Sequence, residues 1–154
     1  MARPMTVVAG ETAVRVRYAE TDQMGVVYYA NFFVWFEVAR VELMRQLGFS
    51  YKKMEVEDDS FVVVAKASCT YKHPAKFDDV LRIRTTVTQS RRRTITFAYE
   101  VFNEAYGTVI ATGETLHVIC DRHGRPKSLP EKYRQYFPLT HAGDSVAAGT
   151  ARKS

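Results

Sequence analysis

A single carboxylate, Asp22, lies in a short glycine-containing segment immediately ahead of a long apolar stretch. The first residues of a helix carry free backbone N–H groups and the positive end of the helix dipole, so they can stabilise a negatively charged oxygen. A carboxylate beside such donors can act as a base or as a nucleophile on a carbonyl group. This combination predicts acyl-transfer chemistry, with Asp22 as the reacting group and the backbone N–H of Tyr29 as the oxyanion donor.

The residue types leave a second interpretation of this segment open. Aspartate is common in turns and as a plain helix cap, so Asp22 could have a purely structural role. Glu20, two residues earlier, is interpreted as a loop or ion-pair residue.

The segments on either side of Asp22 predict a strand before it and a helix after it. Residues 12–18 alternate in polarity with the period of a half-buried strand. Gly25 can adopt backbone angles closed to other residues, which suits a loop. Residues 29–47 have apolar side chains at helical spacing, and Gly48 is placed to cap the end of this helix.

The rest of the chain predicts strands. Polarity alternates over residues 65–72, 81–88, 95–101 and 108–120, with a hairpin turn at residues 103–107. The helix is apolar over most of its circumference, so it must be covered on several sides, which a strongly curved sheet would do. A strand, a helix and then four strands predict an α+β fold with a mainly antiparallel sheet. Residues 130–137 predict a short helix or turn.

Three segments resemble a known family: residues 16–32, residues 37–40 and residues 71–79. They are similar to the 4-hydroxybenzoyl-CoA thioesterase family of hotdog-fold proteins, and more closely to its acyl-CoA thioesterase branch associated with the Tol-Pal system. The stretch from Asp22 to Phe32 is the specific part of the match. The resemblance implies a hotdog domain over residues 9–137, with a long central helix wrapped by a curved sheet, and a catalytic role for Asp22.

The activity implied by the resemblance is acyl-CoA thioester hydrolysis without a cofactor. A thiol leaving group has a pKa of about 8.5, so it departs as a thiolate without a strong general acid. Asp22 would act as a general base on water or attack the carbonyl to form a mixed anhydride, and both mechanisms remain open. The substrate is an acyl-CoA or an acyl carrier protein thioester, with the acyl group open among aromatic, short-chain, branched and fatty groups.

Candidate substrate contacts come from two places in the chain. Met24, Gly25, Val26 and Val27 would line the acyl pocket. Arginines suit phosphate geometry, so Arg91, Arg92 and Arg93 are the candidate contacts to the CoA phosphates. Together with Arg82 and Arg84 they could also form a basic patch facing nucleic acid or a membrane surface, or a plainly solvated sheet face.

Composition sets wider limits. The 154 residues, 46% of them apolar, are typical of one globular domain, and no stretch approaches the ~20 apolar residues that span a bilayer. Without a signal-like N-terminus, the predicted compartment is the cytoplasm. Cys69 and Cys120 lack metal-ligand spacing and are interpreted as buried free thiols. Residues 138–154, rich in small and polar side chains, predict a disordered tail.

Two rival functions and an assembly state complete the expectations. Hotdog hydratases and dehydratases rely on a histidine paired with an acid, and this chain has no histidine before His73. A non-catalytic acyl-CoA sensor would keep the fold without the chemistry. His73, His117, His123 and His141 are scattered and are interpreted as structural. The resemblance implies a homodimer or homotetramer. The spacing of the His, Cys and Asp residues predicts no metal site, and no nucleic-acid partner is expected, since that alternative depends on the arginines alone.

Overall fold

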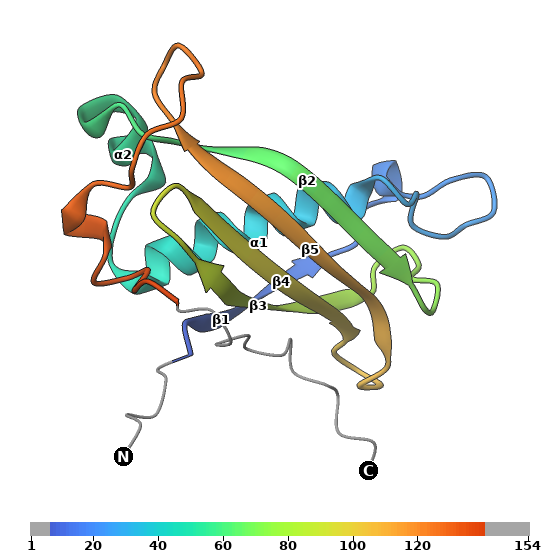
Figure 1. Ribbon diagram of the computed structural model, residues 1–154. Helices are drawn as coiled ribbons and strands as arrows, with labels where there is room; N and C mark the ends of the chain where they lie inside the picture. The colour runs from blue at the N-terminus through green and yellow to red at the C-terminus, as the bar shows by residue number, and fades with distance from the viewer. Residues whose placement is uncertain (1–6, 141–154) are drawn as a thin grey trace, which may run out of the picture.

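The computed structural model of the protein describes residues 7–140. In chain order its elements are β1 (Ala9–Arg15), the 3-10 turn η1 (Tyr18–Glu20), α1 (Asn31–Leu47), α2 (Tyr51–Asp58), β2 (Phe61–Tyr71), β3 (Val80–Ser90), β4 (Thr94–Asn103), β5 (Val109–Cys120) and a second 3-10 turn, η2 (Glu131–Tyr133). Figure 1 shows the strands as one sheet in front of α1. The predicted α+β architecture is confirmed.

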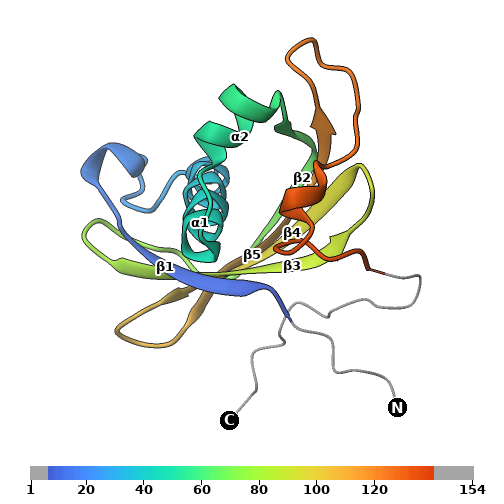
Figure 2. The ribbon, with the colours of Figure 1, turned by 90° about the vertical axis from the view of Figure 1, so that its left-hand side faces the viewer.

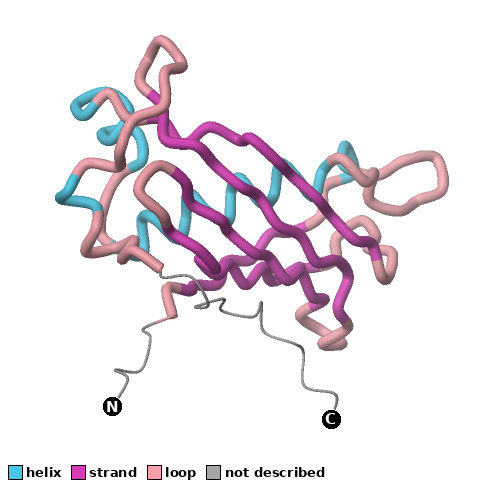
Figure 3. Tube along the Cα trace, in the orientation of Figure 1, coloured by secondary structure: helices cyan, strands magenta, loops and turns pink. Residues whose placement is uncertain are grey.

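The five strands of residues 7–140 pair antiparallel in the order β1-β3-β4-β5-β2. The three central strands follow one another along the chain, while β1 and β2 form the two edges (Figure 3). The sheet is curved, and α1 lies in its concave side with α2 beyond it (Figure 2). The Asp22 loop and the β3–β4 turn therefore lie at opposite ends of the sheet (Figure 1).

Helix α1 is held to the sheet by an apolar stripe that includes Phe36. The Phe36 ring stacks on Tyr99 of β4, with centroids 4.2 Å apart and planes 8° from parallel. A Cβ atom on Gly113 of β5 would lie 2.4 Å from the Phe36 ring. Glycine at position 113 therefore lets the helix approach the sheet closely enough for this stacking.

The end of α1 follows the sequence prediction. Gly48 has φ 103°, and its N–H donates to the carbonyls of Met44 and Arg45. Glycine adopts this left-handed backbone conformation without steric cost, and the conformation ends the helix.

The first strand and the second helix differ most from the predictions. The first strand covers Ala9–Arg15 rather than residues 12–18, because residues 18–20 form the 3-10 turn that leads into the Asp22 loop. Helix α2 was not predicted, because Met54 is its one buried side chain and it has no apolar stripe. Its start does carry a sequence signal: the Ser50 side chain accepts a hydrogen bond from the Lys53 N–H at 3.3 Å.

Contacts to the sheet extend to residue 140, just beyond the predicted domain boundary at residue 137. Phe137 is fully buried, and Thr140 still donates its N–H to the Ser90 carbonyl at 2.8 Å. Most of the predicted tail, residues 141–154, lies outside the described residues.

Edge strand β2 has an unusual pattern of exposure. Residues 63–68 are all exposed, so side chains on both faces of the strand reach solvent. A strand with one buried face would alternate between buried and exposed positions. On α1, Val34 is 54% exposed and Val38 is 44% exposed. These two side chains lie four residues apart and form an apolar surface one helical turn long.

Candidate active site

The loop that carries Asp22 folds back on itself between β1 and α1. Thr21 pairs antiparallel with Val27, and the Asp22 N–H donates to the Val26 carbonyl at 2.9 Å. Gly25 closes the turn with φ 77° and donates its N–H to the Asp22 carbonyl at 3.0 Å. Figure 1 shows this loop as the blue extension beyond the start of α1.

The Asp22 carboxylate is only half engaged by the protein. Its Oδ1 accepts a hydrogen bond from the Met24 N–H at 2.8 Å, and the side chain is partly exposed. Across residues 7–140, its Oδ2 accepts no hydrogen bond from the protein. One oxygen is thus oriented by the loop while the other is available to a substrate or to water.

A second unengaged group lies at the other end of the loop. The Tyr28 N–H donates to the Glu20 carbonyl at 2.9 Å, and the Tyr28 carbonyl accepts from the Asn31 N–H at 3.0 Å. In the described part of the chain, the Tyr29 N–H donates to no protein acceptor. Because a trans peptide is planar, fixing the Tyr28 carbonyl also fixes the direction of the Tyr29 N–H.

Glu20 joins the two ends of the loop and is only 6% exposed. Its Oε1 accepts from the Arg17 backbone N–H at 2.8 Å, and its Oε2 accepts from the Trp35 indole at 2.8 Å. Burial raises the pKa of the Glu20 carboxyl, but the hydrogen bonds from Arg17 and Trp35 outweigh it and lower the pKa overall. Sequence reasoning missed this role, because nothing in the spacing shows that Trp35 turns back toward Glu20.

Aromatic side chains surround the loop. The ring of Tyr18 packs on Phe77 at 4.4 Å, and that of Tyr28 on Tyr29 at 4.7 Å, and all four are substantially exposed. Tyr71 of β2 donates its hydroxyl to the Tyr29 carbonyl at 3.0 Å. Burial, followed by the neighbouring Cys69, raises the pKa of Tyr71 to about 12, so it remains a donor at neutral pH.

The three predicted acyl-pocket side chains differ in their surroundings. Met24 is 86% exposed at the tip of the loop, and Val26 is half-buried beside Lys76. Val27 packs in the hydrophobic core, and its N–H donates to the Ala75 carbonyl at 2.8 Å. Met24 and Val26 are thus the two that reach the surface of the loop.

The predicted CoA contacts lie far from Asp22 in the folded chain. Arg91, Arg92 and Arg93 are exposed on the turn between β3 and β4, whereas the Asp22 loop packs against residues 75 and 76, ahead of β3. An 11-residue strand separates these positions by roughly 35 Å at ~3.3 Å per residue. The arginines therefore do not line the Asp22 site of the same chain.

The predicted basic patch is also divided. Arg82 lies 3.8 Å from Glu11 and 3.7 Å from Glu104, and Arg84 lies 4.0 Å from Glu11. Both arginines extend from the outer face of β3, since the alternating Leu81 and Ile83 are fully buried. Partners on β1 and on the turn after β4 therefore partly neutralise two of the five arginines of this candidate patch.

Four other carboxylates in loops or at helix ends are engaged by basic or backbone groups. Asp78 pairs with Arg15 at 3.3 Å, and Asp79 accepts from the Lys76 N–H at 2.9 Å. Asp58 pairs with Lys132 at 2.8 Å, and Asp59 pairs with Arg122 at 3.1 Å.

Two of the four histidines, His117 and His73, have structural surroundings. His117 is fully buried, and its Nε2 lies 2.8 Å from the Thr115 hydroxyl, which in turn lies 2.7 Å from the Tyr99 hydroxyl. His73 lies 2.9 Å from the Val109 carbonyl at the end of β2. His141 lies outside the described residues. Cys120 is buried and Cys69 is half-buried, and both are free thiols.

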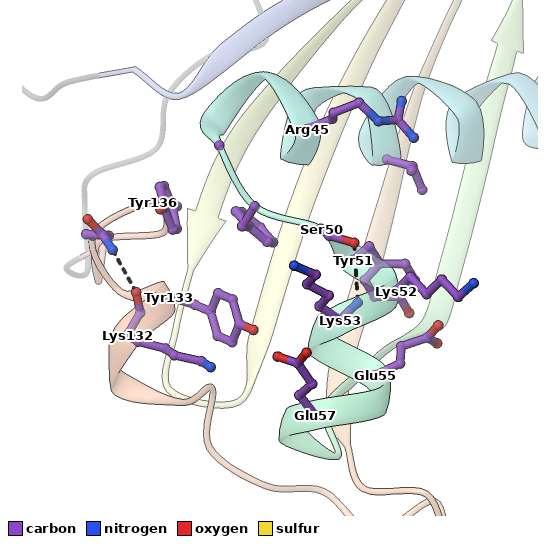
Figure 4. A pocket seen from close by; sticks show the side chains of 14 residues that line it. Arg45, Ser50, Tyr51, Lys52, Lys53, Glu55, Glu57, Lys132, Tyr133 and Tyr136 are labelled. Carbon is purple, nitrogen blue, oxygen red and sulfur yellow. Dashed lines mark hydrogen bonds between the residues drawn. The ribbon is translucent and has the colours of Figure 1, made fainter.

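A pronounced cleft of about 730 Å³ lies at the opposite end of α1 from Asp22, between α2 and η2 (Figure 4). Its wall combines lysines with aromatic rings and carboxylates: Lys52, Lys53, Lys132, Phe49, Tyr133, Tyr136, Glu55 and Glu57. Lys132 is already paired with Asp58 and lies over the Tyr133 ring. The cleft is therefore separate from the Asp22 loop.

The fold and the Asp22 loop match a known protein family. Residues 16–137 match the model of the thioesterase-like superfamily. The chain belongs to the thioesterase-like superfamily. It is 37% identical over 119 residues to the acyl-CoA thioester hydrolase YbgC of Escherichia coli O157:H7, which covers 77% of this chain and 87% of that protein. The resemblance predicted from the loop is thereby confirmed.

Solved structures of this superfamily agree with the fold. The DHNA-CoA thioesterase of Staphylococcus aureus superposes with a TM-score of 0.75 at 34% identity, covering 84% of each chain. The 4-hydroxybenzoyl CoA thioesterase of a Pseudomonas strain superposes with a TM-score of 0.73 at 20% identity, covering 83% of this chain and 98% of that one. The predicted hotdog fold is confirmed. No helix within residues 7–140 is long and apolar enough to cross a membrane.

Proposed function

We propose that this protein is an acyl-CoA thioesterase that uses Asp22 and the start of α1 to hydrolyse a thioester to the free acid and CoA. Its likeness to the YbgC hydrolase and to the DHNA-CoA thioesterase supports the reaction class. The observation that carries the proposal is the pair of unengaged groups in one loop, the Asp22 Oδ2 and the Tyr29 N–H.

The reaction needs a nucleophile and a place for the negative charge that develops on the carbonyl oxygen. Asp22 removes a proton from water as it attacks, or attacks directly to give a mixed anhydride that water then opens. The Tyr29 N–H, at the positive end of the α1 dipole, donates to the oxyanion. The sulfur departs as a thiolate and takes up a proton from solvent.

The active unit in this proposal is a homodimer formed through β2. An unpaired edge strand rich in valine is prone to pair with another strand, and β2 is exposed on both faces. A second copy would also cover the exposed Val34 and Val38 on α1. Light scattering should give a dimer mass, and Val38→Lys, which puts a charge in that surface, should shift it toward the monomer.

An antiparallel β2–β2 pairing brings the arginine turn of one subunit toward the Asp22 site of the other. Val62, near the start of β2, pairs with Ile119 of β5, and the Ile119 N–H donates to the Arg93 carbonyl at 2.8 Å. Two strand spacings, about 10 Å, therefore separate this turn from β2. The end of β2 contacts the Asp22 loop through Tyr71. We assign the arginines to the CoA phosphates across this interface.

The compartment we propose is the cytoplasm, since the two free thiols suit a reducing environment. An acyl carrier protein remains an alternative carrier of the thioester.

The test is thiol release by the purified protein against aromatic, short-chain, branched and fatty acyl-CoAs and their carrier-protein thioesters. A thioesterase completes many turnovers per subunit on at least one of them. Binding of acyl-CoA without turnover across the whole panel would instead identify a sensor. Conversion of an enoyl-CoA without thiol release would identify a hydratase.

A further inference from the structure

We propose that Glu20 is a positioning residue for the thioesterase reaction: it clamps both ends of the Asp22 loop to α1 and thereby sets Asp22 and the Tyr29 N–H relative to each other. The inference rests on the proposed function of Asp22. Its basis is the number of contacts that one buried residue makes to the elements flanking the loop.

The side chain of Glu20 ties the entry of the loop to the body of α1. One carboxylate oxygen holds the backbone of Arg17, which leads from β1 into the loop. The other oxygen holds the indole of Trp35, which is 3% exposed and lies one helical turn beyond the start of α1. The exposed Arg17 guanidinium also forms an ion pair with Glu20, with its Nε 3.3 Å from the Glu20 Oε1.

The main chain of Glu20 ties the exit of the loop to the same point. Its carbonyl accepts from the Tyr28 N–H at 2.9 Å and from the Asn31 Nδ2 at 2.8 Å. These two residues flank Tyr29. Asp22, two residues after Glu20, and Tyr29, one residue after Tyr28, are therefore both attached to the same buried residue.

A plain structural role accounts poorly for the choice of a carboxylate here. A buried charge is costly to desolvate, and an apolar side chain packed against Trp35 would often stabilise a fold equally well. A carboxylate offers something different, because it accepts from two separate elements at once with directional bonds. Such bonds restrict the loop in the way that catalysis requires, since small displacements of reacting groups slow a reaction steeply.

The structure also provides a direct reporter of this clamp. Trp35 is the single tryptophan of the chain. Its indole N–H is bonded to Glu20, and its ring packs edge-on to Phe32 at 5.1 Å. Intrinsic fluorescence therefore reports the state of the Glu20–Trp35 bond without a label.

The experiment compares Glu20→Gln and Trp35→Phe with one matched control. Glu42→Gln removes a carboxylate from α1 that pairs with Arg45 rather than with the loop. Each variant is assayed for kcat, KM and melting temperature. Tryptophan emission is recorded for every variant that retains Trp35.

Glu20→Gln should lower kcat on the order of 10-fold to 100-fold, with a smaller change in KM, and should shift the Trp35 emission. Trp35→Phe should also lower kcat, because it removes the indole donor of the same hydrogen bond. The double variant should lose less than the product of the two single effects, because both disrupt one contact. The Glu42→Gln control should keep kcat within about twofold of the parent.

A folded Glu20→Gln variant with shifted emission and parental kcat would overturn the inference. If that variant does not fold, parental kcat in Trp35→Phe overturns it instead. Asp22→Asn should reduce kcat without moving the emission, so loss of the clamp and loss of the reacting carboxylate are distinguished. A parent protein that hydrolyses no thioester would refute the proposed function and not the clamp, which the Trp35 emission still reports.

Discussion

The two ends of α1 use carboxylates in opposite ways. At the far end, Asp58 pairs with Lys132 and accepts from Tyr133, and Asp59 accepts from Arg122. The hydrogen bonds from Lys132 and Tyr133 hold the pKa of Asp58 below its ordinary value, and burial raises the pKa of Tyr133. At the Asp22 end, both oxygens of Glu20 hold the structure, whereas Asp22 engages one oxygen with the Met24 N–H and keeps the other free.

This difference in hydrogen bonding distinguishes carboxylates that stabilise the fold from the carboxylate that is proposed to act on a substrate. A carboxylate whose oxygens are all engaged is a poor base, since binding to its charged form favours that form. A carboxylate with one oriented and one free oxygen can still accept a proton or attack a carbonyl. Assigning the structural contacts to Glu20 leaves Asp22 available for chemistry.

The largest effect should come from Asp22→Asn, which keeps the shape of the side chain and removes its charge. We expect kcat to fall by ~10²-fold or more, because no other carboxylate in the loop is free to replace it. The melting temperature should change little. Steady-state thiol release on the best acyl-CoA measures the loss, and a variant working near the parental rate would make Asp22 a plain turn residue.

The next effect concerns the loss of stability in acid, which we expect to originate at His117. This residue of β5 pairs with Ile95 of β4, next to the arginine turn and at the opposite end of the sheet from Asp22. Burial, with the charge of Arg40 from α1 adding to it, lowers the pKa of His117 to about 4, and the Val62 backbone opposes this. Protonation therefore favours the unfolded chain. Stability should be highest above pH 6.5 and fall as the pH drops from 6.5 to 4, by roughly 2 kcal/mol.

Urea denaturation at a series of pH values measures this decline. His117→Leu removes the titrating ring, so its free energy of unfolding should depend less on pH in the same interval. An unchanged slope in that variant would assign the acid sensitivity to other groups.

A smaller effect should follow from replacing Arg91, Arg92 and Arg93 together by alanine. Contacts to the CoA phosphates persist from ground state to transition state, so KM should rise about 10-fold while kcat changes little. The penalty should shrink for a pantetheine thioester, which lacks the nucleotide. Equal losses on both substrates would reassign the turn to folding or assembly.

The smallest effect should come from Asp58→Asn, the far-end counterpart of the Asp22 variant. It weakens the contacts to Lys132 and Tyr133 and should lower the melting temperature by a few degrees, with parental kcat. Differential scanning calorimetry and the thiol-release assay measure the two quantities. A large loss of kcat would contradict the division of roles between the two ends.

Much of this architecture follows from local sequence patterns. Alternation predicted the four later strands, and Gly48 predicted the end of α1, because these signals depend on near neighbours. Asp22 was found from the glycine-containing loop and the family motif, and its catalytic role stays a prediction. The contacts of Glu20 to Trp35, and the distance of the arginines from Asp22, depend on how the chain folds back in space.

The pairing of β1 with β3 has a consequence for how the protein assembles. The strands β3, β4 and β5 are joined by short connections, so they can pair early at low entropic cost. Strand β1 reaches its place beside β3 only when residues 16–79 form a closed loop, which is a much longer contact in the chain. Refolding should thus complete the central hairpins before the edge strand docks, and enzymatic activity, which depends on the segment between β1 and α1, should return last.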